Sequence, residues 1–282
     1  MNDSIDTEGE DYLAHLLKEY YHPSIALWRA IEVKAINRYF RKNSILHPIL
    51  DLGCGDGKVS KYIFGEGEVD YGLEIDSECV LWAKELNIYK NLIIADAQAF
   101  PFRQEYFNLV FSNCVIEHIP DNEKVLKNVT SSLKNGSLLI FTVPSNKFGE
   151  YLFFYSLLKK SGLKKLANSY SKTRNELLNH YHCYEINEWK EKLNKYNLEY
   201  VEHHYYLSPK TVKVWDFMAA IIYLLERVRG WRLLEKIFNA SPVVDQFRIR
   251  LFRTLLSPFY KEESDESGGG VLIVARKGQG CE

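Results

Sequence analysis

The sequence lacks the cysteine pattern of a disulfide-stabilised or zinc-binding domain. Only five of its 282 residues are cysteine, at positions 54, 79, 114, 183 and 281, and none forms a CxxC pair. A disulfide framework or a structural zinc site needs cysteines that are paired and closely spaced. The sequence therefore predicts a protein of the reducing cytoplasm.

A long apolar run and an excess of one charge are also missing. The N-terminus, MNDSIDTEGEDY, is acidic where a secretory signal has a positive start and an apolar run. The longest apolar stretch, Val214 to Leu225, contains Asp216 and is shorter than the roughly 20 residues of a spanning helix. With 36 basic and 37 acidic residues, the net charge of −1 predicts no general attraction to nucleic acid.

What the sequence does contain is an alternation of helical and strand patterns. Residues 1–10 are typical of a disordered tail, and residues 11–43 carry apolar positions at helical spacing, broken once at His22–Pro23. We expect two N-terminal cap helices there. The remaining length allows one large domain that carries an insertion.

Five short apolar runs then alternate with helical stretches: HPILDL, VDYGLE, NLIIAD, FNLVFS and SLLIFTV. Runs that are apolar nearly throughout are typical of parallel strands covered by helices on both faces. Helices are expected around 148–166 and 185–196, strands at 198–207 and 271–277, and a helical segment from 209 to about 260. The predicted fold class is α/β.

The first apolar run leads directly into a glycine-rich turn, Gly53-Cys54-Gly55-Asp56-Gly57. Glycines allow backbone N–H groups and a bulky ligand to approach each other closely. Nicotinamide enzymes use related turns, but their GxGxxG pattern starting at Gly53 would require glycine where Lys58 stands. The spacing therefore favours another nucleotide-like cofactor over NAD.

Acidic residues follow the second and third runs. Glu74 stands at the end of the second run, where a carboxylate can accept both ribose hydroxyls, while Asp76 falls in the next turn and can cap a helix. We prefer Glu74 for the cofactor because strand alternation places it at the tip. After the third run, Asp96 could accept a hydrogen bond from an adenine amine and the Ala97 N–H could reach a ring nitrogen.

In this order ILDLGCGDGKVS, YGLEID, IIADAQAFPF, FNLVFSNCVIEHIPD and LKNGSLLIFTVPS resemble the class I methyltransferases, specifically their small-molecule type 11 branch. The match covers roughly residues 45–146. The resemblance implies a Rossmann-like seven-stranded sheet with an antiparallel last strand, and S-adenosyl-L-methionine bound across the carboxyl edge of the first strands.

The resemblance also assigns roles to individual residues. Gly53 and Gly55 would flank the methionine moiety, Glu74 would bind the ribose, and Asp96 and Ala97 would contact the adenine. Asn113 would face the methionine end with its backbone, and Asp51 would anchor the turn.

Arg29, in the second cap helix, is a further cofactor candidate, because a guanidinium can hold the cofactor's carboxylate with two hydrogen bonds. The alternative is an arginine on the helix surface near Glu32 or Glu19.

His118 is the catalytic candidate. It follows the fourth run, where the acceptor should lie, and an imidazole can take a hydroxyl proton near neutral pH. The alternative is that His118 only ties its loop together by hydrogen bonds.

A metal is not expected. Relatives that use magnesium carry a glutamate where this chain has Cys114, so Glu117 and His118 alone leave an oxygen-rich site incomplete. The cluster of His180, His182 and Cys183 has a spacing that suits a transition metal, but we interpret it as a loop over the acceptor pocket that His182 shapes.

Between the last two strands, residues 208–270 form an insertion that should determine the acceptor. It combines WDFMAAIIYLL with Arg227, Arg229, Trp231 and Arg232, and then with Arg248, Arg250 and Arg253. Basic and aromatic residues together are common at membrane surfaces, so peripheral membrane contact through 209–260 is one hypothesis. We favour the other, a lid packed on the core with solvated arginines.

The sequence thus predicts three parts: a tail with cap helices (1–43), a methyltransferase core (44–207 and 271–282) and a helical insertion or lid (208–270). The predicted reaction moves a methyl group from S-adenosylmethionine to a small molecule such as a sugar, isoprenoid or secondary metabolite, at a hydroxyl oxygen. Alternatives are a C- or N-methyltransferase, an enzyme acting on a lipid-linked glycan, or a non-catalytic protein that binds S-adenosylmethionine.

Overall fold

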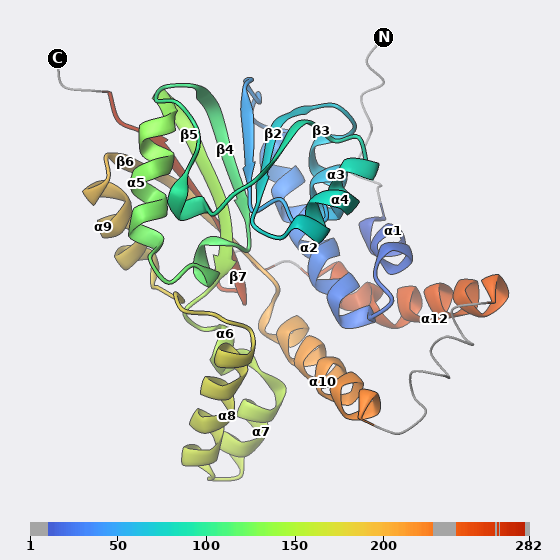
Figure 1. Ribbon diagram of the computed structural model, residues 1–282. Coiled ribbons are helices and arrows are strands. Elements are labelled where there is room, and N and C mark those ends of the chain that lie inside the picture. The colour runs from blue at the N-terminus through green and yellow to red at the C-terminus, as the bar shows by residue number, and fades with distance from the viewer. Residues whose placement is uncertain (1–10, 228–240, 263, 265, 280–282) are drawn as a thin grey trace.

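The computed structural model describes residues 11–227, 241–262, 264, 266–279, and its centre is one mixed sheet (Figure 1). In these residues the sheet has seven strands in the order β3-β2-β1-β4-β5-β7-β6. The strands are β1 (Ile49–Leu52), β2 (Val69–Glu74), β3 (Tyr89–Ile94), β4 (Phe107–Asn113), β5 (Leu133–Pro144), β6 (Leu198–Tyr206) and β7 (Gly270–Lys277). Neighbouring strands among β1–β5 pair in parallel, and β7 pairs antiparallel with both β5 and β6. This confirms the predicted α/β class and the antiparallel last strand.

Helices cover both faces of the sheet, which explains why its strands are apolar nearly throughout. One face packs against α5 (Asn122–Ser132) and α9 (Ile186–Lys195), with Trp189 fully buried. The other packs against α2 (Pro23–Phe40) and α3 (Lys58–Phe64). In β4 the alternation is visible, because Val110 belongs to the first face and Phe111 to the second. Helix α4 (Ser77–Glu85) connects β2 with β3.

A second apolar core lies among the helices at the carboxyl side of the sheet. It joins α1 (Tyr12–Glu19) and α2, the predicted cap helices, with α10 (Pro209–Glu226) and α12 (Pro242–Tyr260) of the predicted insertion. Figure 1 shows α10 beside α6 (Phe148–Tyr151), α7 (Phe153–Lys160) and α8 (Lys164–Leu177), all beyond the end of β5. The carboxyl edge of the sheet therefore faces a helical lobe rather than open solvent.

The single helix predicted around 148–166 is wrong, because three helices occupy that region. Leu152 has extended backbone angles and a buried side chain, which ends α6 and starts α7. Gly162, with φ +78°, closes the C-terminus of α7, where the amide of Leu163 donates to the carbonyl of Leu158. Apolar spacing alone did not reveal either break.

Among the arginines of the insertion, Arg248 differs from the expectation that these side chains are solvated, whereas Arg250 and Arg253 are exposed. Arg248 donates to the carbonyls of Leu17 and Tyr21 and pairs with Asp245, so it fastens α12 to the end of α1. Arg253 pairs with Asp11. Arg229, Trp231 and Arg232 lie outside the described residues, as do residues 1–10 of the predicted tail.

No helix in the described part of the chain combines the length and the apolar character needed to cross a membrane.

Candidate active site

The glycine turn after β1 is fixed by backbone hydrogen bonds to the neighbouring strand, β2. The amides of Gly53 and Cys54 donate to the carbonyl of Leu73, at 2.7 and 3.0 Å. Gly53 and Gly55 have positive φ angles of +74° and +55°. A Cβ on Gly53 would collide with Val115, whereas a Cβ on Gly55 would meet nothing within 4 Å. Gly53 is therefore required by packing, and Gly55 leaves the space that a ligand would fill.

Asp51 of β1 holds this turn in place by hydrogen bonds. Its carboxylate is 1% exposed and accepts hydrogen bonds from Ser60 Oγ (2.5 Å) and Tyr89 Oη (2.7 Å). Burial raises the pKa of Asp51 to about 6 despite these two donors. The contacts tie β1 to the first turn of α3 and to β3, so they fix the position of the glycines between them.

Glu74 lies over the turn, as strand alternation predicts. One carboxylate oxygen accepts from the Gly55 amide at 2.9 Å, and the other accepts from the amides of Ile75 (2.8 Å) and Asp76 (3.0 Å). Asp76 instead caps α4, accepting from the amides of Glu78 and Cys79. Asp76 therefore caps a helix, as the sequence suggested, while the Glu74 carboxylate lies beside the glycine turn.

Asp96 and Ala97 lie at the neighbouring strand end, because the Ala95 amide donates to the carbonyl of Glu74. The Asp96 carboxylate accepts from the Gln98 amide at 2.7 Å and also from the Gln98 side chain. Gln98 is a residue of this site that the sequence reasoning missed, since nothing in its spacing points to the carboxylate.

A buried carboxylate, Glu32, connects cap helix α2 with the ends of β4 and β6. It is 0% exposed. Arg29 Nη1 (2.5 Å), Asn113 Nδ2 (3.0 Å), Cys114 Sγ (3.0 Å) and Tyr206 Oη (2.7 Å) all donate to it. Burial favours the neutral acid, but the Arg29 charge and the bonds from Cys114 and Asn113 outweigh it and lower the pKa of Glu32.

This network contains two of the predicted cofactor residues, Arg29 and Asn113. The sequence suggested Glu32 as one neighbour of Arg29, from their spacing in the helix, and that pairing is present. The contacts to β4 and β6 join residues 81 and 174 positions apart, so no local pattern could have shown them.

The connection between α1 and α2 reaches the glycine turn. The ring of Tyr20, at the end of α1, lies under the Lys58 ammonium at 5.4 Å from the ring centre. Burial raises the pKa of the Tyr20 phenol, and the charge of Asp56 adds to this effect. The cap helices therefore cover the turn that follows β1.

His118 lies in a short 3₁₀ turn, η3 (Ile116–His118), just after β4. Its Nδ1 is 3.0 Å from the Asn179 carbonyl oxygen, so Nδ1 carries the proton and Nε2 has a free lone pair. Burial lowers the pKa of His118. His118 thus ties two loops together through one nitrogen and presents the other for chemistry.

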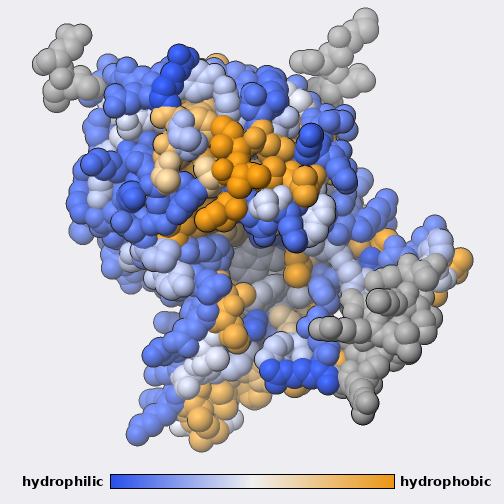
Figure 2. Space-filling model, in the orientation of Figure 1, coloured by the Kyte–Doolittle hydropathy of each residue, from blue (hydrophilic) through white to orange (hydrophobic). Residues whose placement is uncertain are grey.

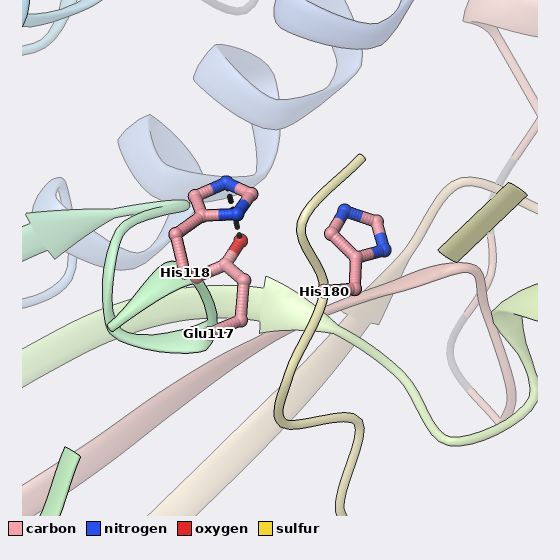
Figure 3. A group of neighbouring side chains, drawn as sticks. All are labelled: Glu117, His118 and His180. Carbon is pink, nitrogen blue, oxygen red and sulfur yellow. Dashed lines mark ion pairs between the residues drawn. The ribbon is translucent and has the colours of Figure 1, made fainter. Parts of the chain in front are cut away.

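Glu117 and His180 flank His118 (Figure 3). Glu117 is 1% exposed, and burial raises its pKa to about 8. Glu117 Oε1 is 3.7 Å from His118 Nε2. The rings of His118 and His180 lie 5.6 Å apart, and burial lowers the pKa of His180 to about 4. Among the described residues, these three side chains have potential ligand atoms within 4.8 Å of one another.

His180, His182 and Cys183, whose spacing suits a transition metal, do not share one site among the described residues. His182 Nε2 faces the carbonyl oxygens of Ile119 (2.9 Å) and Pro120 (3.1 Å), while Cys183 Sγ faces Asn175. His182 therefore fastens its loop to the segment after His118, and His180 is the histidine that approaches the catalytic candidate.

An aromatic cluster formed by three helices reaches His180 through one of its rings. Phe148 of α6 lies 5.3 Å from the His180 ring and 5.7 Å from Trp215 of α10, and Trp28 of α2 lies 5.2 Å from Trp215. This aromatic cluster, Trp28, Phe148, Trp215, belongs to the second apolar core, and Phe148 is its contact with the polar triplet. The cap helices, α6 and the insertion all contribute to it.

Three comparisons with known proteins bear on this arrangement. Residues 50–141 match the methyltransferase domain family of type 11. These residues carry the methyltransferase domain of this family. The glycine turn, Glu74 and the ends of β3 and β4 all lie within residues 50–141. The cofactor of this family is S-adenosylmethionine. The chain is an S-adenosylmethionine-dependent methyltransferase.

Relatives differ in the reactions their names describe. The ubiquinone biosynthesis O-methyltransferase of Coxiella burnetii is 23% identical over 199 residues, which are 67% of this chain and 81% of that protein. Phosphoethanolamine N-methyltransferase 2 of Caenorhabditis elegans is 29% identical over 138 residues, 44% of this chain and 31% of that protein. An S-adenosylmethionine-dependent methyltransferase structure from Archaeoglobus fulgidus shares the fold, with TM-score 0.52, 15% identity and coverage of 88% and 94%.

Proposed function

We propose that this methyltransferase modifies a hydroxyl oxygen of a small molecule and that His118 acts on that hydroxyl. The observation that carries the proposal is the position of His118, which follows Val115 by three residues. The Val115 side chain lies against Gly53, and Nδ1 of His118 is bonded to the Asn179 carbonyl, which leaves Nε2 without the proton. The loop that carries the imidazole therefore packs against the donor turn. Methyl transfer to a hydroxyl needs an oxygen aligned with the methyl group and a group that handles its proton.

The contacts around the turn support the placement of the cofactor. Gly53 and Gly55 would flank the methionine moiety, Glu74 would accept the ribose hydroxyls, and Asp96 and Ala97 would contact the adenine. The open space at Gly55 and the carboxylate of Glu74 directly above it fit a nucleoside lying across these strand ends.

The other cofactor residues would act at the methionine end. Arg29 is held by Glu32 through Nη1, so a contact to the methionine carboxylate would use other N–H groups of the guanidinium. Asn113 is fixed by its bonds to Glu32 and Thr142, which would keep its backbone facing the cofactor. Asp51 would contribute only through the shape of the turn.

We propose that the chain divides into residues 1–43, a core of 44–207 and 271–282, and an insertion of 208–270. The insertion would form the acceptor pocket. The aromatic cluster supports this role, since Trp215 of α10 packs against Phe148, whose ring lies beside His180. The name of the Coxiella relative, an O-methyltransferase of ubiquinone biosynthesis, is consistent with this chemistry.

The test measures cofactor binding and methyl transfer separately. Purified protein is titrated with S-adenosylmethionine, its demethylated product and NAD by calorimetry, and then screened for methyl transfer to phenols, sugars and isoprenoid alcohols. We expect both sulfur nucleosides to bind and NAD not to bind. His118→Ala should lower kcat roughly 100-fold or more, the usual scale for a proton-handling group, while the Kd for S-adenosylmethionine stays within twofold.

His204→Ala is the matched control, because His204 lies on β6 and contacts Glu202 instead of the site. Unchanged turnover in His118→Ala would remove His118 from the chemistry. A product methylated at nitrogen or carbon would overturn the assignment of the acceptor atom.

A further inference from the structure

Glu117, His118 and His180 come together from two segments that are distant in sequence. Glu117 and His118 belong to η3, and His180 follows α8, with its ring facing the other two side chains (Figure 3). Two atoms bound to one metal ion at 2.0–2.2 Å are at most about 4.4 Å apart. The 3.7 Å between Glu117 Oε1 and His118 Nε2 meets this limit, and the potential ligand atoms of all three side chains lie within 4.8 Å of one another.

The buried carboxylate supplies an independent observation. Glu117 is 1% exposed, yet its Oε2 has no hydrogen-bond partner among the described residues. Buried polar atoms are almost always paired, because leaving one unpaired is costly. The missing partner of Glu117 is therefore a group that the described residues do not provide at this place, and a cation would satisfy it.

Both histidines are oriented as metal ligands usually are. His118 Nδ1 faces the Asn179 carbonyl oxygen at 3.0 Å, and His180 Nδ1 faces Asn175 Oδ1 at 3.1 Å. Each bond fixes the proton on Nδ1 and leaves the lone pair of Nε2 available. A second nitrogen held by an oxygen acceptor is the arrangement that positions histidine ligands in metalloproteins.

The two segments are also fastened to each other. The Tyr181 amide donates to the Glu117 carbonyl at 2.9 Å, and His182 contacts the carbonyls of Ile119 and Pro120. Cys114, which precedes Glu117 by three residues, is not available as a ligand because its thiol donates to Glu32. The triplet is thus a preformed group of three ligands.

We propose that Glu117, His118 and His180 bind a divalent transition-metal ion such as Zn²⁺ or Mn²⁺. Two imidazoles and one carboxylate suit these ions, whereas Mg²⁺ prefers a site made of oxygen ligands. Three protein ligands leave at least one coordination position for a further oxygen. If the proposed function holds, that oxygen is the acceptor hydroxyl. His118 Nε2 would then hold the ion, and the ion would make the hydroxyl proton easier to lose to solvent.

Metal binding is measured on the full-length protein after chelator treatment, with neither cofactor nor acceptor present. Calorimetric titration with Zn²⁺, Mn²⁺ and Mg²⁺ should give one equivalent of Zn²⁺ and of Mn²⁺, with Mg²⁺ at least 100-fold weaker. The absorption spectrum of bound Co²⁺ reports imidazole ligation in the same sample. His180→Ala and Glu117→Gln should each weaken Zn²⁺ at least tenfold, and His204→Ala should leave the affinity unchanged.

The absence of stoichiometric binding would overturn the inference, and so would equal Zn²⁺ affinity in wild type, His180→Ala and Glu117→Gln. Because Glu117→Gln keeps the size of the side chain, it remains informative if His180→Ala fails to fold, which circular dichroism would reveal. A protein that binds Zn²⁺ through the triplet but methylates only nitrogen would refute the proposed function and leave this inference intact.

Discussion

At the scale of single residues, the glycine turn separates two requirements that look alike in sequence. Both Gly53 and Gly55 adopt positive φ, but only Gly53 is packed against a side chain, that of Val115. The open space is at Gly55. Packing therefore requires glycine at position 53, and the proposed cofactor site would require it at position 55.

Alanine substitutions at Gly53 and Gly55 should therefore have different effects on stability and on cofactor binding. Gly53→Ala combines backbone strain with a collision against Val115 and should lower the free energy of unfolding by about 2–4 kcal/mol. Gly55→Ala should cost only about 1 kcal/mol of backbone strain, yet weaken S-adenosylmethionine at least tenfold. Urea denaturation measures the free energy of unfolding, and calorimetry measures the affinity for S-adenosylmethionine. Wild-type affinity in Gly55→Ala would refute the role proposed for this glycine.

Asp51 provides a pH-dependent test at the same scale. Its pKa is raised from 3.8 to about 6 by burial, so the folded state favours the protonated acid more than the unfolded state does. Its contribution to stability is therefore greatest below pH 4 and is lost as the pH rises through 6. Relative to Asp51→Asn, which cannot ionise, the wild type should lose about 3 kcal/mol over this range.

The measurement is urea denaturation of both proteins at pH 5.0, 6.0 and 7.5. The free energy of unfolding of the wild type should fall relative to that of Asp51→Asn at each step. A difference that stays constant across the three pH values would show that Asp51 does not change its ionisation in this window.

At the scale of elements, Glu32 is what attaches cap helix α2 to the sheet. Its donors come from α2 itself, from the end of β4 and from the end of β6. Removing one member of such a buried network leaves a charge or a polar group without its partner. The network therefore couples the cap to the strand ends where the cofactor would lie.

Glu32→Ala should destabilise the protein by about 3–5 kcal/mol, because it leaves the Arg29 guanidinium without its buried partner. The double variant Glu32→Ala with Arg29→Ala should recover part of the loss. Thermal or urea denaturation of the wild type, the two single variants Glu32→Ala and Arg29→Ala, and the double variant forms a double-mutant cycle. A single-variant loss below about 1 kcal/mol would mean that water replaces Glu32 with little cost.

At the scale of the whole molecule, the question is whether the helical lobe touches a membrane. Exposed apolar side chains occur on it, including Phe217 and Leu224 of α10 and Phe247 of α12, and Figure 2 shows apolar groups at the lower end of the α7–α8 hairpin. Against a membrane role, Arg248 and Arg253 are engaged by α1 and Asp11. Contact through 209–260 stays a hypothesis, and we favour the lid.

Vesicle flotation decides between them. With anionic phosphatidylglycerol vesicles at moderate salt, we expect the full-length protein to stay in the soluble fraction, because its net charge is −1 and these arginines are paired. Flotation with the vesicles, followed by its loss in Phe217→Ser with Leu224→Ser, would refute the lid interpretation.

The sequence by itself determined the sheet and the donor end of the site. Apolar runs, a glycine turn and Glu74 are local patterns, and the carboxyl ends of parallel strands meet at one edge whatever the surrounding helices do. The strand positions, the antiparallel last strand and the separate roles of Glu74 and Asp76 could therefore be predicted. The break of the 148–166 region into three helices could not, since it depends on where Leu152 is buried.

Only the tertiary structure decided the acceptor end. Glu32 is joined to Tyr206 across 174 positions, and His118 is brought beside His180 rather than His182 because the carbonyls of residues 119 and 120 hold His182 away. Such contacts depend on how segments fold back on one another, and no spacing along the chain encodes them. The family pattern therefore identifies the methyl donor, while the packing of the cap helices, loops and insertion around His118 determines what can receive the methyl group.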